Sequence, residues 1–136
     1  MAAELAIISI LKSDSTIQSY CGSSPVRVYP FQVVQGQVMP AIVVRSQGTE
    51  PNHTKDGPSE LDIERVQVLI YSQNFTADTF VLENRVRTLC DRGATGSING
   101  VALESSSFED RDTFKEQITD REVHVIEHIY KCLITR

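Results

Sequence analysis

Two segments rich in β-branched residues constrain the fold more than any other feature of the chain. Leu61–Tyr71 alternates, with Val66, Val68 and Ile70 on one face of the predicted strand. Glu122–Ile134 is longer and carries apolar residues on both faces. Strands of this kind bury their apolar faces against other elements, so the sequence predicts a sheet with packed helices.

Further strand-like segments surround these two. Val26–Tyr29 is bounded by prolines, which predicts an edge or first strand. Ala41–Gln47 is a firmer strand. Asn99-Gly100 predicts a tight turn that leads into a strand over Val101–Phe108. Because most of these strands are joined by short or hairpin-like connections, we expect mainly antiparallel pairing.

Two polar segments are predicted to be long, exposed hairpin loops. Thr49–Glu60 contains two prolines, and Glu109–Asp120 is rich in carboxylates with basic residues between them. Within the strand after the first loop, Leu61 and Ile63 are out of phase with Val66. This shift predicts a β-bulge near Glu64-Arg65.

Three segments have helical patterns: Ala2–Lys12, Ser15–Tyr20 and Ala77–Arg92. The first has Leu5, Ile8 and Leu11 near one face, and Asp14 offers an N-cap for the second, which we expect to end at Gly22.

The third helix carries the clearest end signals. Thr76 is a predicted N-cap, and Phe75 and Phe80 occupy the two positions of a hydrophobic staple. Glu83 and Arg87 have the spacing of a helical ion pair. A buried stripe is expected from Leu82, Val86, Leu89 and Cys90.

These elements predict one α+β domain over residues 1–136: a mainly antiparallel sheet of four to five strands, with N-terminal helices and one longer helix packed against it. The net charge of −5 argues against gripping nucleic acid or an anionic membrane. Three scattered cysteines indicate a reducing compartment, and no segment has the length of a spanning helix. We therefore expect a soluble, intracellular protein.

The residues that could carry chemistry favour structural roles. His124 and His128 share a predicted strand, where residues four apart lie roughly 13 Å from each other, too far for one zinc ion. Cys90 and Cys132 fall on apolar stripes, and Cys21 has no basic neighbour in sequence that would activate it. The carboxylates of Glu109–Asp120 lack the spacing of a calcium loop. We expect no enzyme activity, no catalytic residue, no cofactor and no metal.

The ordered set of segments resembles the tail-completion, or tail-to-head joining, family of long-tailed bacteriophages and prophages. Apart from the helices and the hairpin, the segments that carry the resemblance are Arg27-Val28-Tyr29-Pro30, Met39-Pro40-Ala41-Ile42-Val43-Val44, Lys55-Asp56-Gly57-Pro58-Ser59-Glu60-Leu61, Arg65-Val66-Gln67-Val68 and Phe108-Glu109-Asp110-Arg111-Asp112. The turn Tyr20-Cys21-Gly22-Ser23-Ser24 is more polar than the turn associated with the family.

The resemblance implies a structural virion protein without catalysis. Such tail terminators form a ring, expected here to be a hexamer, that caps the head-proximal end of the tail tube and joins it to the head connector. The implied location is the head–tail junction of the virion, after assembly in the bacterial cytoplasm. Two alternatives stay open: a head-completion or stopper protein on the portal, and a small binding domain unrelated to phages.

A ring of this kind needs contacts between copies, and long hairpin loops can supply them. The residues predicted to contact other subunits or the connector are Pro51, His53, Lys55, Asp56, Arg111, Asp112, Phe114 and Lys115. Phe114 is the large apolar residue of its charged segment, which suits an interface anchor. DNA would pass through the ring without specific binding, and carboxylates lining the lumen would repel its phosphates.

Overall fold

The computed structural model describes residues 3–23, 25–31, 39–54, 57–91, 96–98, 101–118 and 121–135. Of the predicted features, Lys55, Asp56 and the Asn99-Gly100 turn lie outside these residues. No helix of the described part is long and apolar enough to cross a membrane.

A six-stranded sheet with the order β1-β2-β3-β6-β5-β4 forms the centre of the fold. Its strands are β1 (Val28–Pro30), β2 (Ala41–Thr54), β3 (Gly57–Ser72), β4 (Gly96–Ile98), β5 (Val101–Ile118) and β6 (Arg121–Thr135). Only the β1–β2 pair is parallel among the described strands. The predicted α+β fold is confirmed, with four long strands flanked by two strands of three residues.

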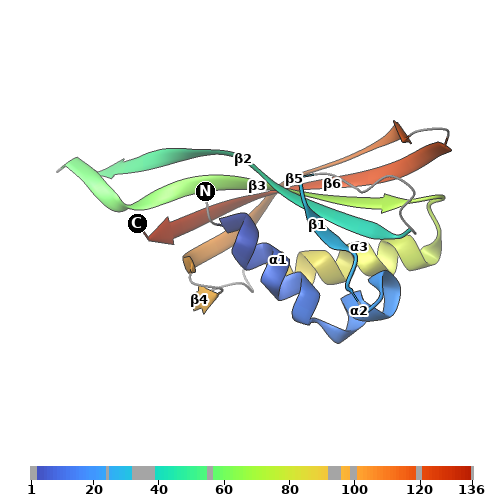
Figure 1. Ribbon diagram of the computed structural model, residues 1–136. Coiled ribbons are helices and arrows are strands. Elements are labelled where there is room, and N and C mark those ends of the chain that lie inside the picture. Colours follow the sequence, from blue (N-terminus) through green and yellow to red (C-terminus); the bar gives the residue numbers. More distant parts are fainter. Residues whose placement is uncertain are drawn as a thin grey trace.

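The two predicted long loops are strands, so this part of the prediction was wrong. β2 and β3 stay paired as far as Thr54 and Gly57, and β5 and β6 as far as Ile118 and Arg121. Residues 109–117 of β5 are exposed, so they show no hydrophobic alternation and their sequence reads as a polar loop although the strand is paired with β6. The β2–β3 ribbon projects beyond the rest of the sheet (Figure 1).

The predicted bulge lies on the neighbouring strand. The register shifts in β2 between Ser46 and Gly48, opposite Val66 and Arg65, and the pairing of β3 with β6 continues without a shift. The phase change within β3 has another cause, because Glu64 occupies an inward position and is fully buried. A buried carboxylate among apolar neighbours looks like a break in the sequence pattern.

Three helices, α1 (Ala3–Ser13), α2 (Ser15–Cys21) and α3 (Ala77–Cys90), lie on the same side of the sheet (Figure 1). Asp14 caps α2, since its carboxylate accepts the Ile17 amide hydrogen at 3.1 Å, and Gly22 follows α2 with φ 82°. The Arg85 Nε also donates to Asp14 at 3.0 Å and links α3 to this cap. Leu5 was wrongly placed on the buried stripe of α1, because it is 44% exposed, whereas Ile8 and Leu11 are buried as predicted.

The start of α3 agrees with the prediction, but the predicted ion pair between Glu83 and Arg87 does not form. The Thr76 amide donates to Thr79 Oγ1 at 3.3 Å, and the rings of Phe75 and Phe80 lie 5.9 Å apart, as a staple requires. Glu83 does not pair with Arg87 but points toward the sheet, whereas the Arg87 Nε lies 3.7 Å from an Asp91 oxygen.

Apolar clusters occupy both faces of the sheet. The larger lies under the helices and includes Ile7, Ile17, Val68, Leu82 and Ile126. The smaller lies on the face away from the helices and consists of Val43, Leu69, Tyr71, Val123 and Val125, with Met39 packed against it. This pattern explains why β6 carries apolar residues on both faces.

Candidate interaction surface

The edge strand β5 carries four of the residues predicted to contact partners: Arg111, Asp112, Phe114 and Lys115. Beyond Leu103, β5 pairs with β6 alone among the described strands, so its other side is a sheet edge. Edge strands offer unpaired backbone groups to other chains, and proteins commonly protect them with charged side chains.

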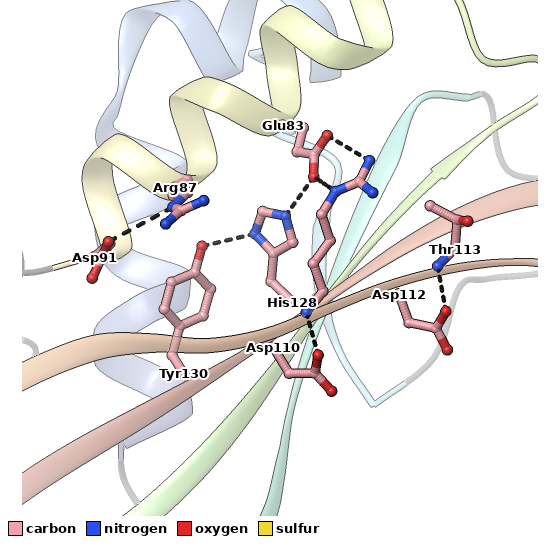
Figure 2. A network of polar contacts seen from close by, with 9 residues as sticks. Glu83, Arg87, Asp91, Asp110, Asp112, Thr113, His128 and Tyr130 are labelled. Atoms are coloured by element: carbon pink, nitrogen blue, oxygen red, sulfur yellow. Dashed lines mark hydrogen bonds and ion pairs between the residues drawn. The ribbon is translucent and has the colours of Figure 1, made fainter.

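Three aspartates protect this edge through direct hydrogen bonds. The Phe108 amide donates to Asp91 at 3.0 Å. The amides of Arg111 and Thr113 each donate to the preceding aspartate, Asp110 and Asp112, at 2.8 Å. Figure 2 shows the last two bonds along the strand. Because these amides are already occupied, this stretch is poorly suited to pairing with a strand of another chain.

Phe114 and Lys115 lie beside an apolar groove. The groove has a volume of about 410 Å³ and is lined by Phe75, Thr113, Phe114, Lys115 and His124. The rings of Phe75 and His124 lie 4.9 Å apart, and Phe114 is 37% exposed. The Lys115 Nζ lies 3.5 Å from a carboxylate oxygen of the exposed Glu122. The structure therefore places two predicted contact residues of one strand beside a surface that can accept an apolar group.

Arg111 forms an ion pair within the chain, and its predicted contact with a partner stays a prediction. Its guanidinium donates from Nε and Nη2 to the Glu83 carboxylate, which is only 9% exposed. The same carboxylate lies 2.7 Å from His128 Nε2, and His128 Nδ1 lies 2.8 Å from the Tyr130 hydroxyl (Figure 2). These four residues form a polar network between α3 and the sheet.

The network is satisfied when the His128 ring is neutral. Tyr130 then donates to Nδ1, and the Nε2 hydrogen is donated to Glu83. Burial lowers the pKa of His128, although Glu83 opposes this shift. Burial works against ionisation of Glu83, but hydrogen bonds from Arg111 and His128 outweigh it and lower the pKa of Glu83. These pKa shifts indicate that Glu83 is an ionised carboxylate facing the Arg111 guanidinium and a neutral His128 imidazole.

Stacking contacts surround the His128 and Tyr130 part of this network and close that part from solvent. The Arg87 guanidinium carbon lies 4.0 Å from the centre of the Phe108 ring, a cation–π contact. Phe108 meets His128 edge-on at 5.2 Å. His128 is 1% exposed and Tyr130 is fully buried, so the network fastens α3 to the sheet and presents no open site.

The β2–β3 ribbon carries the other predicted contact residues. Pro51 is opposite Asp62, and His53 is opposite Pro58, with a register shift between Pro51 and His53. These residues therefore belong to a strand and not to a loop, and their side chains are outside the described part. The structure does not bring them near β5, because β3 and β6 lie between β2 and β5 in the sheet.

The remaining chemical candidates do not converge among the described residues. No group of three or more His, Cys, Asp or Glu side chains there could hold a metal ion. His124 stacks on Phe75, whereas His128 belongs to the buried network. Burial raises the pKa of Cys21 and Cys132 to about 11 and also raises that of Cys90, which disfavours a reactive thiolate.

Comparison with known proteins gives a match in structure but not in sequence. No protein-family model and no curated protein matches the chain. Solved structures do match. One is a chain from the virion of a native gene transfer agent particle, with a TM-score of 0.65 and 12% sequence identity. The alignment covers 98% of this chain and 94% of that one. The two chains share a fold over almost their whole lengths.

Sequence reasoning missed Glu83, Tyr130 and Phe31. Glu83 was assigned to a surface ion pair, because its contact with His128 joins residues 45 positions apart. Tyr130 had no assigned role, and it contacts His128 two positions away on the same strand. A carboxylate within the apolar stripe of α3 was the available signal. Phe31 is 68% exposed with φ 69°, and no pattern in the sequence indicates that conformation.

Proposed function

We propose that the chain is a structural subunit of a phage-type virion. In this role it closes the head-proximal end of the tail tube as a ring of identical copies and joins it to the head connector. The observation that carries the proposal is the fold shared with a gene transfer agent virion chain over 98% of this chain. The resemblance of the ordered sequence segments to tail-completion proteins gives the more specific role.

The shape of the molecule supports a role in assembly. Two antiparallel ribbons end at Thr54 and Gly57 and at Ile118 and Arg121, and the first projects beyond the sheet (Figure 1). Projecting ribbons can reach neighbouring subunits, as ring formation requires. A protected sheet edge in β5 would keep free subunits from pairing edge to edge before assembly.

The chemistry of the described residues supports a function without catalysis, cofactor or metal. The cluster that most resembles an acid–base group, Glu83 with His128 and Tyr130, is closed to solvent. All three cysteines are buried. These residues stabilise the subunit, and the function arises from its surfaces.

The proposed partners are further copies of the chain, expected as six in a ring, the tail tube protein and the head connector. The net charge of −5 suits a channel through which DNA slides without binding, because like charges repel. The proposed location is the head–tail junction of the virion.

A tube-growth assay tests this function. The tail tube protein of the same phage would be polymerised with and without the chain, and tube lengths would be compared by electron microscopy. We expect added chain to stop growth and to sediment with the tubes. Unchanged tube lengths together with binding to isolated portals would favour the stopper alternative, and no binding to either would contradict both virion roles.

A further inference from the structure

A small pocket lies where β2 begins and β3 ends, between this end of the sheet and two helices. Its lining comes from α2, from the residues before β2, from the end of β3 and from the first turns of α3. Its volume is about 210 Å³, below the roughly 300–1,000 Å³ of sites that hold cofactors and drug-sized ligands. A pocket of this size has room for a single side chain.

Hydrogen bonds hold the walls of this pocket in place. Arg27 donates from Nη2 to the Tyr20 carbonyl and from Nε to the Pro40 carbonyl, both at 3.0 Å. These two bonds tie the end of α2 to the residues before β2. The Thr79 hydroxyl donates to the Asn74 carbonyl at 3.2 Å and fixes the first turn of α3. The pocket is therefore formed in the free chain, which reduces the cost of ordering it on binding.

Ser72 supplies a buried hydroxyl to the lining. The residue is 5% exposed, and its Oγ has no hydrogen-bond partner among the described residues. Side chains alternate along a strand, so Ser72 lies on the helix-covered face of β3 with Val68 and Ile70, and it lines the pocket. An unpaired buried hydroxyl is unfavourable, whereas a bound group that donates a hydrogen would satisfy it.

Asp78 determines which charge the pocket accepts. Among the described residues that line the pocket, Asp78 alone is charged, and it is exposed in the first turn of α3. The N-terminus of a helix carries roughly half a positive charge, which the full charge of a carboxylate exceeds. Arg27 lies outside the lining, and its guanidinium donates to the carbonyl end of α2. A cation is therefore favoured over an anion beside Asp78.

The remaining walls favour the stem of a long basic side chain. They are apolar or aromatic: Tyr20, Met39, Pro40 and Leu82. Arginine and lysine bury their methylene stems along such surfaces and keep the charged head near water. Arginine fits better than lysine, because its planar group has five donors in a fork and can stack on an aromatic ring. Such a fork can donate to two acceptors, and the pocket provides the Ser72 hydroxyl and the Asp78 carboxylate.

We propose that this pocket binds an arginine side chain of a partner protein. The Asp78 carboxylate pairs with the guanidinium, and the Ser72 hydroxyl accepts one of its hydrogens. Tyr20 and Leu82 contact the stem. The inference goes beyond the proposed ring, because it concerns a site within one chain and does not depend on the role of the assembly. One side chain binds weakly, so the pocket contributes a single specific contact to a larger interface.

Titration of the full chain with capped tripeptides, followed by the NMR shifts of backbone amides, tests the site. An arginine peptide, glycine-arginine-glycine, is compared with its citrulline counterpart, which has nearly the same shape without the charge, and with its lysine counterpart. We expect the arginine peptide to shift the amides of Ser72, Gln73, Asp78 and Thr79 saturably, with a Kd on the order of 1 mM. The citrulline peptide should bind roughly tenfold more weakly. Absence of saturable shifts at these amides, or equal binding of the arginine and citrulline peptides, would overturn the site, and equal binding of the lysine peptide would overturn the assignment to arginine.

Two variants assign the contacts, with Glu104→Gln as the matched control. Glu104 is exposed near the start of β5, at the opposite end of the sheet from Ser72, so its loss should leave binding unchanged. Asp78→Asn should weaken binding of the arginine peptide roughly tenfold, with unchanged circular dichroism. Ser72→Ala should weaken binding without lowering Tm, because the hydroxyl is unpaired among the described residues of the free chain.

Wild-type affinity of Asp78→Asn would overturn the site. A lower Tm with wild-type affinity in Ser72→Ala would show that the serine is structural and would overturn its role in binding. Every one of these measurements uses the isolated chain, so a negative result would leave the ring function intact, and the tube-growth assay tests that function separately.

Discussion

Replacing Glu83 with glutamine tests whether the buried network holds α3 on the sheet. Glu83 accepts two hydrogen bonds from Arg111 and one from His128. The amide offers a single acceptor oxygen and turns an NH₂ donor toward a second donor. Glu83→Gln should therefore destabilise the protein without changing its fold.

The expected loss follows from the contacts. Hydrogen bonds to a charged group contribute about 1.5–3 kcal/mol each, and at least one is lost. Arg111 is 41% exposed at its side chain, so water can solvate it once released, but His128 at 1% cannot be solvated. We expect a loss of about 2–3 kcal/mol in the free energy of unfolding. In a chain of this length each kcal/mol lowers Tm by roughly 3–5 °C, so Tm should fall by about 6–15 °C.

Thermal and urea unfolding followed by circular dichroism would measure the loss. Glu122→Gln is the matched control, because Glu122 faces Lys115 in an exposed ion pair at 3.5 Å, where removal of the charge should cost less than about 1 kcal/mol. Equal stability of Glu83→Gln and wild type would refute the reasoning that this network fastens α3.

The same network makes stability depend on pH. The folded state lowers the pKa of His128, whose unfolded value is about 6.5. The unfolded chain then binds more protons, so wild-type stability should be fully present above about pH 6.5 and fall as the pH drops below it. Ionised Glu83 partly offsets this shift of His128, so Glu83→Gln should lose stability more steeply than wild type between about pH 6.5 and 5. A flat profile for both proteins would contradict the neutral assignment of His128.

Three further predictions concern other parts of the chain. Burial and a hydrogen bond to Glu64 raise the pKa of Glu4 to about 7, so wild-type stability relative to Glu4→Gln should be greatest below about pH 4.5 and decline as the pH rises through 7 in urea titrations. Asp112→Ala frees the Thr113 amide on the β5 edge and should raise light scattering by free protein above that of the equally charged control Glu122→Ala; equal scattering would argue against edge protection. The three buried cysteines are Cys21, Cys90 and Cys132. A thiol reagent should modify none of them in native protein and all three in urea, and rapid labelling of the native protein would contradict their burial.

The parts of the fold that could be predicted from sequence are those with local signals. Val66, Val68 and Ile70 share a buried face, as their alternation indicates. Thr76 and the Phe75–Phe80 staple define the start of α3, because caps and staples depend on residues a few positions apart. Such features are recognisable before any tertiary contact is known.

The parts that could not be predicted depend on distant partners. The outer parts of β2–β3 and β5–β6 are held by cross-strand pairing, and residues 109–117 of β5 are all exposed, so no hydrophobic alternation marks that segment as a strand. Arg111 turns toward Glu83 and donates to its carboxylate. This contact could not be predicted, because the two residues lie 28 positions apart in sequence and only the fold brings them together. Among the predicted contact residues, Phe114 and Lys115 do lie beside a groove, while a partner contact for any of them stays a prediction.

The proposed function is tested most directly by locating the chain on tail tubes in electron micrographs. Purified chain would be mixed with tail tubes of the same phage, and particle images would be averaged along the tube axis. We predict a ring at one end of each tube, with a central opening and a mass equal to several copies of the 15.2-kDa chain. Density distributed along the tube, attachment to heads instead of tubes, or no bound density would contradict the proposal.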